Sequence, residues 1–263
     1  LVDCGMEQGV DVFQNIPLPV PASSIEAVFL THAHIDHSGL IPLLYKNGFR
    51  GVVYATSATC MLANIMLRDS ANIQMQDAER DTRKAMRAGQ GPVEPRYTIN
   101  DAEGLLKLMR PCSYDELLQI NENVTIRFND AGHLLGSASI EVWLQEGQNE
   151  RKVLFSGDVG NINQPILRNP VPIDEADFVV IESTYGDRLH EERKNVVQPL
   201  AAYLQDTFDR GGNVVIPAFA VGRTQELLYG IREVKAMGLV HGHDDAPIFL
   251  DSPLAQEATA IFR

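Results

Sequence analysis

Residues 31–39 read Thr-His-Ala-His-Ile-Asp-His-Ser-Gly, and this stretch is the most informative part of the sequence. Three imidazoles and one carboxylate fall within the six residues from His32 to His37. They directly follow residues 25–31, which have the β-branched and apolar content of a buried strand. A loop at the end of a strand can turn all four side chains inward, whereas a helix would spread them around its circumference. The pattern therefore indicates a metal-binding loop rather than a polar, solvated one.

The four polar side chains of this loop favour zinc over iron or manganese, because imidazole and carboxylate are ligands that zinc accepts readily. Four ligands so close in sequence would crowd a single ion. We therefore expect two ions to share the cluster. His32 and His34 would bind the first, and Asp36 and His37 the second.

Two later residues fit as partners of the loop. His133 follows a predicted strand and precedes a Gly/Ser-rich turn, which suits a third ligand of the first ion. Asp158 lies in a glycine turn at the end of another apolar strand, where it could bridge both ions. Taken alone, His133 could equally be a hydrogen-bonded core histidine and Asp158 a turn-former. Together with the histidine loop, both are interpreted as ligands.

The composition is that of an ordinary globular protein. Hydrophobic residues make up 44% and charged residues 22% of the 263 residues. No apolar run approaches the roughly 18 residues that a membrane span needs, so no membrane partner is expected. The three cysteines are scattered and form no CxxC pair, which favours a reducing cytoplasm. The net charge of −13 argues against broad attraction to nucleic acid but leaves room for a local basic groove.

The hydrophobic pattern predicts two α/β parts with a boundary near Asp187. In the first part, strands are predicted at 25–31, 51–55, 124–130, 138–144, 152–156 and 178–182, with helices over 38–46 and, interrupted, over 57–109. In the second part the order is helix, strand, helix, strand, at 195–209, 213–217, 223–237 and 247–250. Such alternation predicts a second domain around a parallel sheet.

The motifs described so far resemble those of the metallo-β-lactamase superfamily over residues 1–185. The matching residues are Asp3, the loop from His32 to His37, His133 and Asp158. The resemblance implies an α/β fold of the αβ/βα sandwich type holding two zinc ions. It also implies that Asp3 contacts a metal ligand on the side away from the metal and so fixes the ligand's geometry. The alternative is that Asp3 lies in an ordinary turn at a strand end.

Three further segments resemble the β-CASP branch of that superfamily: residues 181–187, 217–228 and 251–255. This branch consists mostly of nucleic-acid nucleases, including ribonuclease J and the endonuclease of pre-mRNA cleavage and polyadenylation. The resemblance implies a metallo-β-lactamase domain over 1–186, the start of an inserted cap domain over 187–263, and a substrate cleft between them.

Both ends of the sequence are interpreted as truncated. Residues 1–5 resemble a strand entered midway, and residues 253–263 resemble the opening of a helix. The resemblance places two more histidines beyond Arg263, one a ligand of the second zinc and one a proton donor to the leaving group.

The resemblance also implies roles for several remaining residues. Glu182 would orient the proton-donating histidine, unless it only caps a turn. Arg223 precedes a predicted helix and could bind a phosphate, although a structural ion pair is the alternative. Ser183 and Thr184 are expected to contact substrate beside it. Outside the site, His241 and His243 are expected in an exposed loop, His190 at the surface or between domains, and residues 68–87 on a solvated helix face.

The function implied is a zinc-dependent phosphodiester hydrolase that cleaves RNA, as an endonuclease, a 5′–3′ exonuclease or both. A hydroxide bridging two Zn²⁺ ions would attack phosphorus, with Asp36, Asp158 and Glu182 as the catalytic residues. The expected partner is single-stranded RNA, in the cytoplasm, with a homodimer left open. The alternatives are a metal-free RNA-processing scaffold, a DNA nuclease of the same branch, and a small-molecule hydrolase.

Overall fold

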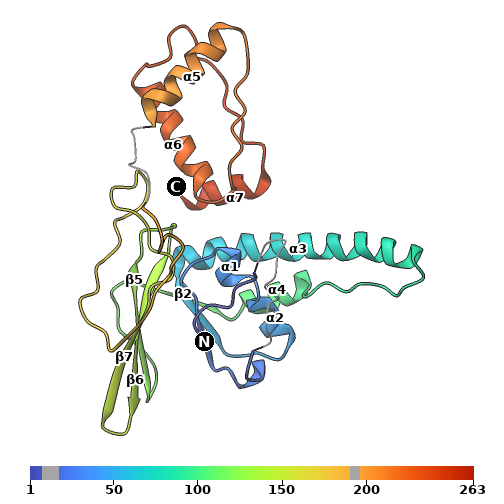
Figure 1. Ribbon diagram of the computed structural model, residues 1–263, viewed down its shortest axis with the longest axis vertical. Coiled ribbons are helices and arrows are strands. Elements are labelled where there is room, and N and C mark those ends of the chain that lie inside the picture. The colour runs from blue at the N-terminus through green and yellow to red at the C-terminus, as the bar shows by residue number, and fades with distance from the viewer. Residues whose placement is uncertain (8–17, 190–195) are drawn as a thin grey trace. The chain divides into compact units, whose positions relative to one another are not determined.

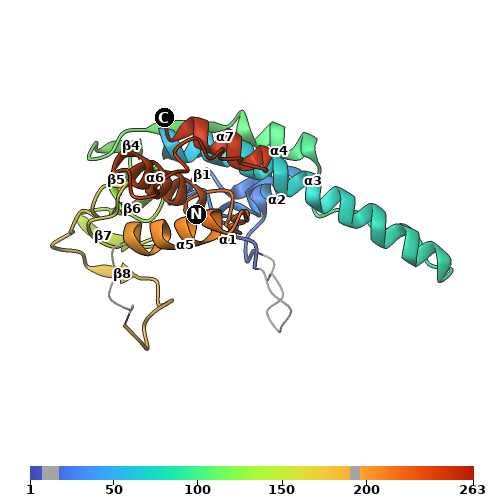
Figure 2. The same cartoon turned by 90° about the horizontal axis from the view of Figure 1, so that it is seen from above.

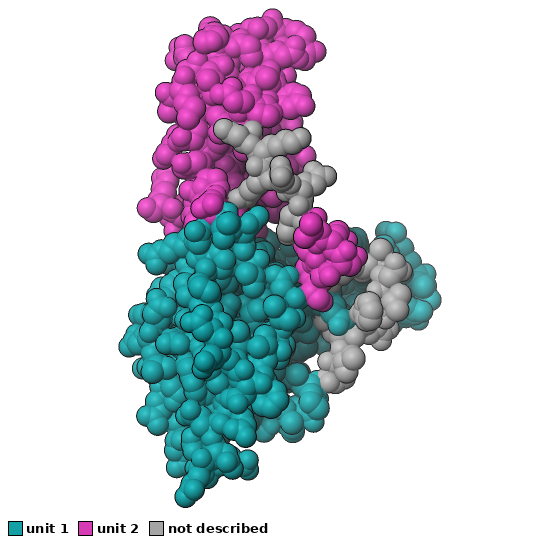
Figure 3. Space-filling view, turned by 60° about the vertical axis from the view of Figure 1, so that its left-hand side comes forward, with its two compact units in different colours: residues 1–162, 168–182 teal, residues 163–167, 183–263 magenta. Residues whose placement is uncertain are grey.

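The computed structural model describes residues 1–7, 18–189 and 196–263. They divide into two units, coloured separately in Figure 3. The first unit comprises residues 1–162 and 168–182, and the second comprises residues 163–167 and 183–263. The predicted domain ranges, 1–186 and 187–263, differ slightly from these units, and their assignment to a catalytic and a cap domain stays a prediction.

The first unit contains two sheets. Its first sheet is parallel, with strand order β1-β2-β3. The second has the order β4-β5-β6-β7-β8 and is antiparallel except that β8 pairs with β7 in parallel. The strands are β1 Ala27–Phe29, β2 Val52–Thr56, β3 Met109–Cys112, β4 Leu118–Asn121, β5 Val124–Asp130, β6 Ala138–Glu146, β7 Asn149–Phe155 and β8 Phe178–Val180.

Helices cover the first sheet on the side away from the second sheet (Figure 1). The longest, α3, begins directly after β2 and extends past the other helices of the unit (Figures 1 and 2). The helical segments of this unit are η1 Ala22–Ser24, α1 Ile35–Ser38, α2 Ile41–Lys46, α3 Ser57–Arg87 and α4 Ile99–Leu106. The predicted α/β class is thus confirmed.

The core lies between the two sheets. Side chains alternate between the faces of a strand, so every second residue of β5 and β6 turns inward. Phe29 and Tyr54 of the first sheet pack there against apolar side chains of the second, namely Ile126, Phe128, Ile140 and Val142. This packing fixes the strand ends from which the site's side chains project.

The opposite face of the second sheet carries a buried ion-pair cluster around Glu141, whose side chain is 0% exposed. Burial alone would raise the pKa of this carboxyl, but hydrogen bonds from Arg127 and Lys152 outweigh it and lower the pKa to about 2. The three residues lie on adjacent strands β5, β6 and β7, so the cluster joins the middle of the sheet.

The second unit contains the helices α5 Val197–Asp209, α6 Arg223–Ala236 and α7 Pro253–Ile261. Helices α5 and α6 pack through Ala201, Leu204 and Val234. The predicted strands at 213–217 and 247–250 are wrong for the described residues, where both segments lack ladder partners. Val214 packs against the core between α5 and α6, but other apolar side chains of these segments stay outside it, with Val215 88% and Phe249 84% exposed. Strand propensity without a hydrogen-bonded neighbour does not make a strand.

The helices of both units lie within the described part of the chain. None of these helices combines the length and the apolar character required to cross a membrane.

Candidate metal centre

The histidine loop begins where β1 ends. The backbone N–H of Leu30 still donates to the Tyr54 carbonyl of β2, and then Thr31 leaves the sheet. His34 is the N-cap of the short helix α1, and His37 lies in the same helix. The predicted loop geometry describes only part of this segment, because Asp36 and His37 lie in α1 and the Asp36 side chain is 63% exposed rather than turned inward.

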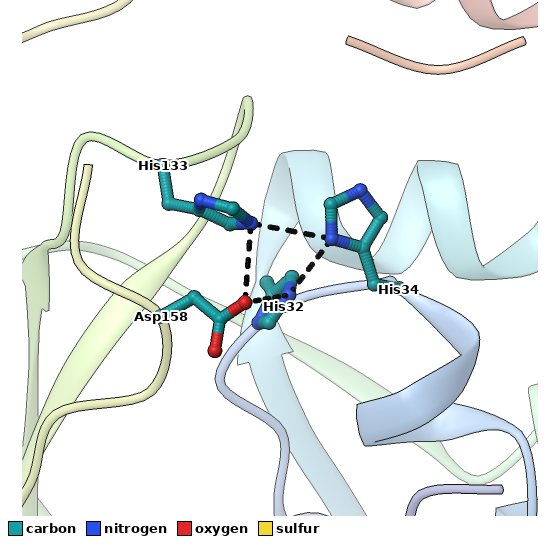
Figure 4. Close-up of side chains that lie close together, drawn as sticks. All are labelled: His32, His34, His133 and Asp158. Carbon is teal, nitrogen blue, oxygen red and sulfur yellow. Dashed lines mark hydrogen bonds and ion pairs between the residues drawn. The ribbon is translucent and has the colours of Figure 1, made fainter. Parts of the chain in front are cut away.

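Four donors converge on one point (Figure 4). They are single ligand atoms of His32, His34, His133 and Asp158, all within 4.8 Å of one another. His34 Nδ1 lies 3.0 Å from His32 Nε2 and 3.3 Å from His133 Nε2. The Asp158 Oδ2 atom lies 3.4 Å from His133 Nε2 and 3.9 Å from His32 Nε2. Three chain segments, which follow β1, β5 and β7, thus meet at this point.

The chemistry of this donor set fits a divalent cation. Burial, followed by the neighbouring imidazoles, lowers the pKa of His32 well below its ordinary value, so the ring is neutral. Burial also lowers the pKa of His34. Neutral imidazoles whose nitrogens face one another cannot all donate to each other, so lone pairs are left pointing at a common centre. Three nitrogens and one carboxylate oxygen match the ligand types and number of a tetrahedral zinc site.

Asp158 also faces a second set of donors. Its Oδ1 atom lies 3.1 Å from His37 Nε2, opposite the oxygen that faces the first set. Asp36 Oδ2 lies 3.9 Å from the same His37 nitrogen, on a side chain that is 63% exposed. Asp36 and His37 are therefore outside the four-donor cluster but share Asp158 with it. This arrangement is compatible with a carboxylate that bridges two ions.

Asp3 lies behind His37. Its Oδ2 atom is 2.7 Å from His37 Nδ1, and its Oδ1 atom accepts the Thr31 backbone N–H at 2.8 Å. Burial would lower the pKa of His37, but hydrogen bonds with Asp158 and Asp3 raise it to about 10. In the metal-free protein this ring thus carries a proton that a cation would have to displace.

Thr31 is a residue of the site that the sequence did not point to. Its hydroxyl donates to Asp3 Oδ2 at 2.8 Å and lies 3.1 Å from His32 Nδ1. Because that hydroxyl hydrogen is already used, Thr31 accepts from the His32 Nδ1–H, which leaves the Nε2 lone pair toward the other donors. The available signal was a hydroxyl side chain directly before the first histidine.

Glu182 lies beside the turn that carries Asp158. Its Oε1 atom accepts the backbone N–H of Val159 at 2.7 Å, and its own N–H donates to Ser156 Oγ at 3.0 Å. Glu182 therefore contacts both sides of the Asp158 turn. The next two predicted site residues, Ser183 and Thr184, are exposed and belong to the second unit.

Arg223 is the first residue of α6, in the second unit. Its side chain is 62% exposed, and its guanidinium pairs with Glu226 at 2.6 Å. The structural ion pair predicted as an alternative is therefore present, and a phosphate-binding role stays a prediction.

The remaining histidines lie away from the donor cluster or outside the described residues. His243 pairs with Asp209 at 2.9 Å, and neither it nor His241 belongs to a donor cluster within the described ranges. His190 lies outside the described residues.

Comparison with known proteins now adds to this geometry. Residues 1–171 match the Metallo-beta-lactamase superfamily domain. The chain is 37% identical over 265 residues to Ribonuclease TTHA0252 of Thermus thermophilus, covering 100% of this chain and 54% of that protein. It is 35% identical to the RNase J-like protein of Methanocaldococcus jannaschii, with the same two coverages. It is 32% identical to Transcription termination factor FttA of Methanosarcina mazei, covering 99% of this chain and 39% of the relative.

The chain spans about half the length, or less, of these relatives. The domain match alone covers well over half of the 263 residues and includes the histidine loop, His133 and Asp158. By this match the chain belongs to the metallo-β-lactamase superfamily, as its motifs predicted.

Proposed function

We propose that the protein is a dinuclear zinc phosphodiester hydrolase of the β-CASP branch that cleaves single-stranded RNA in the cytoplasm. The observation that carries the proposal is Asp158. One of its oxygens belongs to the four-donor cluster, and the other faces His37. A carboxylate with a donor set on each side can hold two ions close together, as two-metal hydrolysis uses them.

The residues that would hold the ions follow from these distances. His32, His34, His133 and Asp158 would bind the first ion. Asp36, His37 and the other oxygen of Asp158 would bind the second. When bound, the two ions would supply Lewis acidity that neutralises phosphate oxygens and lowers the pKa of a water toward neutrality.

The chain's own residues prepare this centre. Thr31 sets the His32 tautomer, and Asp3 accepts from the far nitrogen of His37. Such partners orient metal-binding rings and raise their basicity. Glu182 holds the turn after Asp158 through the Val159 N–H. Asp36, Asp158 and Glu182 remain the proposed catalytic residues.

RNA as the substrate is supported by the names of two relatives, a ribonuclease and an RNase J-like protein. The motifs at 181–187, 217–228 and 251–255, which resemble the β-CASP branch, support it further. In this proposal Arg223, Ser183 and Thr184 contact the RNA, and cleavage is endonucleolytic, 5′–3′ exonucleolytic or both.

The test uses the full-length protein and a matched pair of variants, His34→Ala and His243→Ala. We expect about two zinc ions per wild-type chain by metal analysis, and cleavage of an end-labelled single-stranded RNA. His34→Ala removes one of the four clustered donors and should lose most of the metal. RNA cleavage should fall more than about 100-fold, because several kcal/mol of metal-derived stabilisation are lost.

His243→Ala is the control, since this histidine lies in the second unit, where it pairs with Asp209 and contacts the Phe208 ring. It should retain both metal and activity. Full metal content in His34→Ala would disprove the assignment of the cluster. If the wild-type protein holds zinc but cleaves only a DNA of the same sequence, the substrate is DNA and not RNA.

A further inference from the structure

A pair of buried hydroxyls lies behind His133, on a different part of the chain. Thr56 ends β2 and is the N-cap of α3, and Thr59 lies in the first turn of that helix. Thr56 is 3% exposed and Thr59 is 0% exposed. Both hydroxyls donate to the same backbone carbonyl, that of Gly136, at 2.6 Å for Thr56 and 2.8 Å for Thr59.

Gly136 belongs to the loop between β5 and β6 that carries His133. The backbone φ of Gly136 is 85°, and a Cβ atom at this position would lie 2.5 Å from the Thr59 nitrogen. The loop backbone therefore rests directly on the start of α3, with no side chain between them. The carbonyl has both acceptor positions filled by buried donors, which anchors it firmly.

The loop transmits this anchor to the ligand through its internal hydrogen bonds. Ser137 Oγ accepts the backbone N–H of His133 at 3.0 Å and that of Leu134 at 3.1 Å. The Ser137 carbonyl accepts the Tyr114 hydroxyl at 2.8 Å. Only Leu134 and Leu135 separate Gly136 from His133, and Ser137, the residue after Gly136, holds the backbone of His133 and Leu134 by hydrogen bonds.

We infer that Thr56 and Thr59 form a hydroxyl clamp that positions the metal ligand His133. The clamp does not touch metal or substrate and acts only through the Gly136 carbonyl. It couples the start of α3 to the metal centre, although Thr59 and Gly136 are 77 residues apart in the sequence. This inference rests on the proposed metal site and names two residues on which its affinity depends.

The decisive variant is Thr59→Val, which keeps the side-chain shape and removes one donor. Loss of a partner behind a metal ligand typically reduces metal affinity about 10- to 100-fold. We expect a reduction in that range for zinc in a chelator-competition titration of the full-length protein. Thr59→Ser restores the hydroxyl and should restore the affinity.

Thr98→Val is the matched control. Thr98 is the N-cap of α4, as Thr56 is of α3, and its hydroxyl bonds with Asp101 in the first turn of the same helix. Its loss should lower the melting temperature while leaving zinc affinity at the wild-type value. Equal zinc affinities of Thr59→Val and Thr98→Val would overturn the clamp and leave the proposed function standing.

A second measurement tests the hydroxyl clamp in the absence of metal. In the metal-free protein, hydrogen exchange of the amides of residues 133–138 should be about 5- to 10-fold faster in Thr59→Val than in Thr98→Val, because one anchoring bond is gone. Unchanged exchange there would also overturn the clamp. If wild-type protein binds no zinc but the exchange difference is observed, the proposed function fails and the structural clamp stands.

Discussion

Asp158 is the residue on which both donor sets depend. Its two oxygens face different histidines, His133 on one side and His37 on the other, at 3.4 Å and 3.1 Å. The hydrogen bond with His37 is the main reason that the pKa of Asp158 is lowered. In the proposed dinuclear site this carboxylate would contact two ions, which requires its turn to be held still. The nearest candidate for that task is Glu182, through the Val159 N–H.

Two substitutions separate the charge of Glu182 from its role as a hydrogen-bond acceptor. Glu182→Gln keeps an oxygen for the Val159 N–H, so zinc affinity should equal that of the wild type. Glu182→Met removes the acceptor, and zinc affinity should fall about 10-fold or more. If Glu182 also orients a proton-donating histidine, RNA cleavage should fall in both variants. The measurements are chelator competition and cleavage of labelled RNA.

The controls for this pair are Glu150→Gln and Glu150→Met, since Glu150 is an exposed carboxylate at the other end of β7. Neither change there should alter zinc affinity. An unchanged affinity in Glu182→Met would show that the Val159 contact does not hold Asp158. Full RNA cleavage by Glu182→Gln would show that Glu182 only holds the Asp158 turn and does not orient a proton-donating histidine.

Local sequence could indicate the clustered donors but not the residues that hold them. His32 and Asp158 stand out in the sequence because a histidine-rich loop and a glycine turn each follow an apolar strand, and the fold brings the two residues into one cluster. Thr31 and Thr59 carry common hydroxyls, and such a hydroxyl becomes part of the site only through the partner that the fold brings to it. For Thr59 that partner is a carbonyl 77 residues away, which no local pattern encodes.

At the scale of elements, the turn that follows β7 aims Asp158 at the site. Gly157 has a φ of 55°, and a Cβ atom there would lie 2.9 Å from the Thr31 side chain. Gly147, in the hairpin between β6 and β7, has a φ of 60° with no atom within 4 Å of such a Cβ. The two glycines thus share a left-handed backbone and differ in their surroundings.

Alanine at these two glycines should therefore have unequal effects. Gly147→Ala should cost about 1–2 kcal/mol of unfolding free energy, the cost of a left-handed backbone with a Cβ atom. Gly157→Ala should cost more, because Thr31 must also move, and it should weaken zinc binding. Urea unfolding and chelator competition measure the two effects. Equal stability losses and equal zinc affinities would mean that the turn tolerates the added methyl group.

Strands were predicted correctly where apolar and polar side chains alternate. They were predicted wrongly where strand formation depends on hydrogen bonding to a neighbouring strand. The strand at 124–130 was predicted with its observed bounds, because its inward residues Ile126 and Phe128 alternate with polar ones. Strand β3 was missed because Pro111 interrupts it, which an edge strand of the sheet tolerates. The segments at 213–217 and 247–250 have strand composition but no ladder partner among the described residues.

At the scale of the whole molecule, the donors and the predicted phosphate contact lie on different units. The four clustered donors, with Asp36 and His37, all belong to the first unit, whereas Arg223 belongs to the second. The chain carries a net charge of −13, so the proposed RNA substrate would be attracted locally rather than by the overall charge. Local cations therefore decide how strongly RNA binding depends on salt.

Arg223→Ala tests this point in the full-length protein. If Arg223 binds a phosphate, the variant should bind single-stranded RNA more weakly, and the slope of log affinity against log salt should shrink by about 0.7. Zinc content should not change. Arg232→Ala is the matched control, because Arg232 lies on the same helix, is 71% exposed and pairs with Glu233 as Arg223 pairs with Glu226. Equal slopes in both variants would leave Arg223 with the ion pair alone, which at an exposed site contributes at most about 1 kcal/mol of stability.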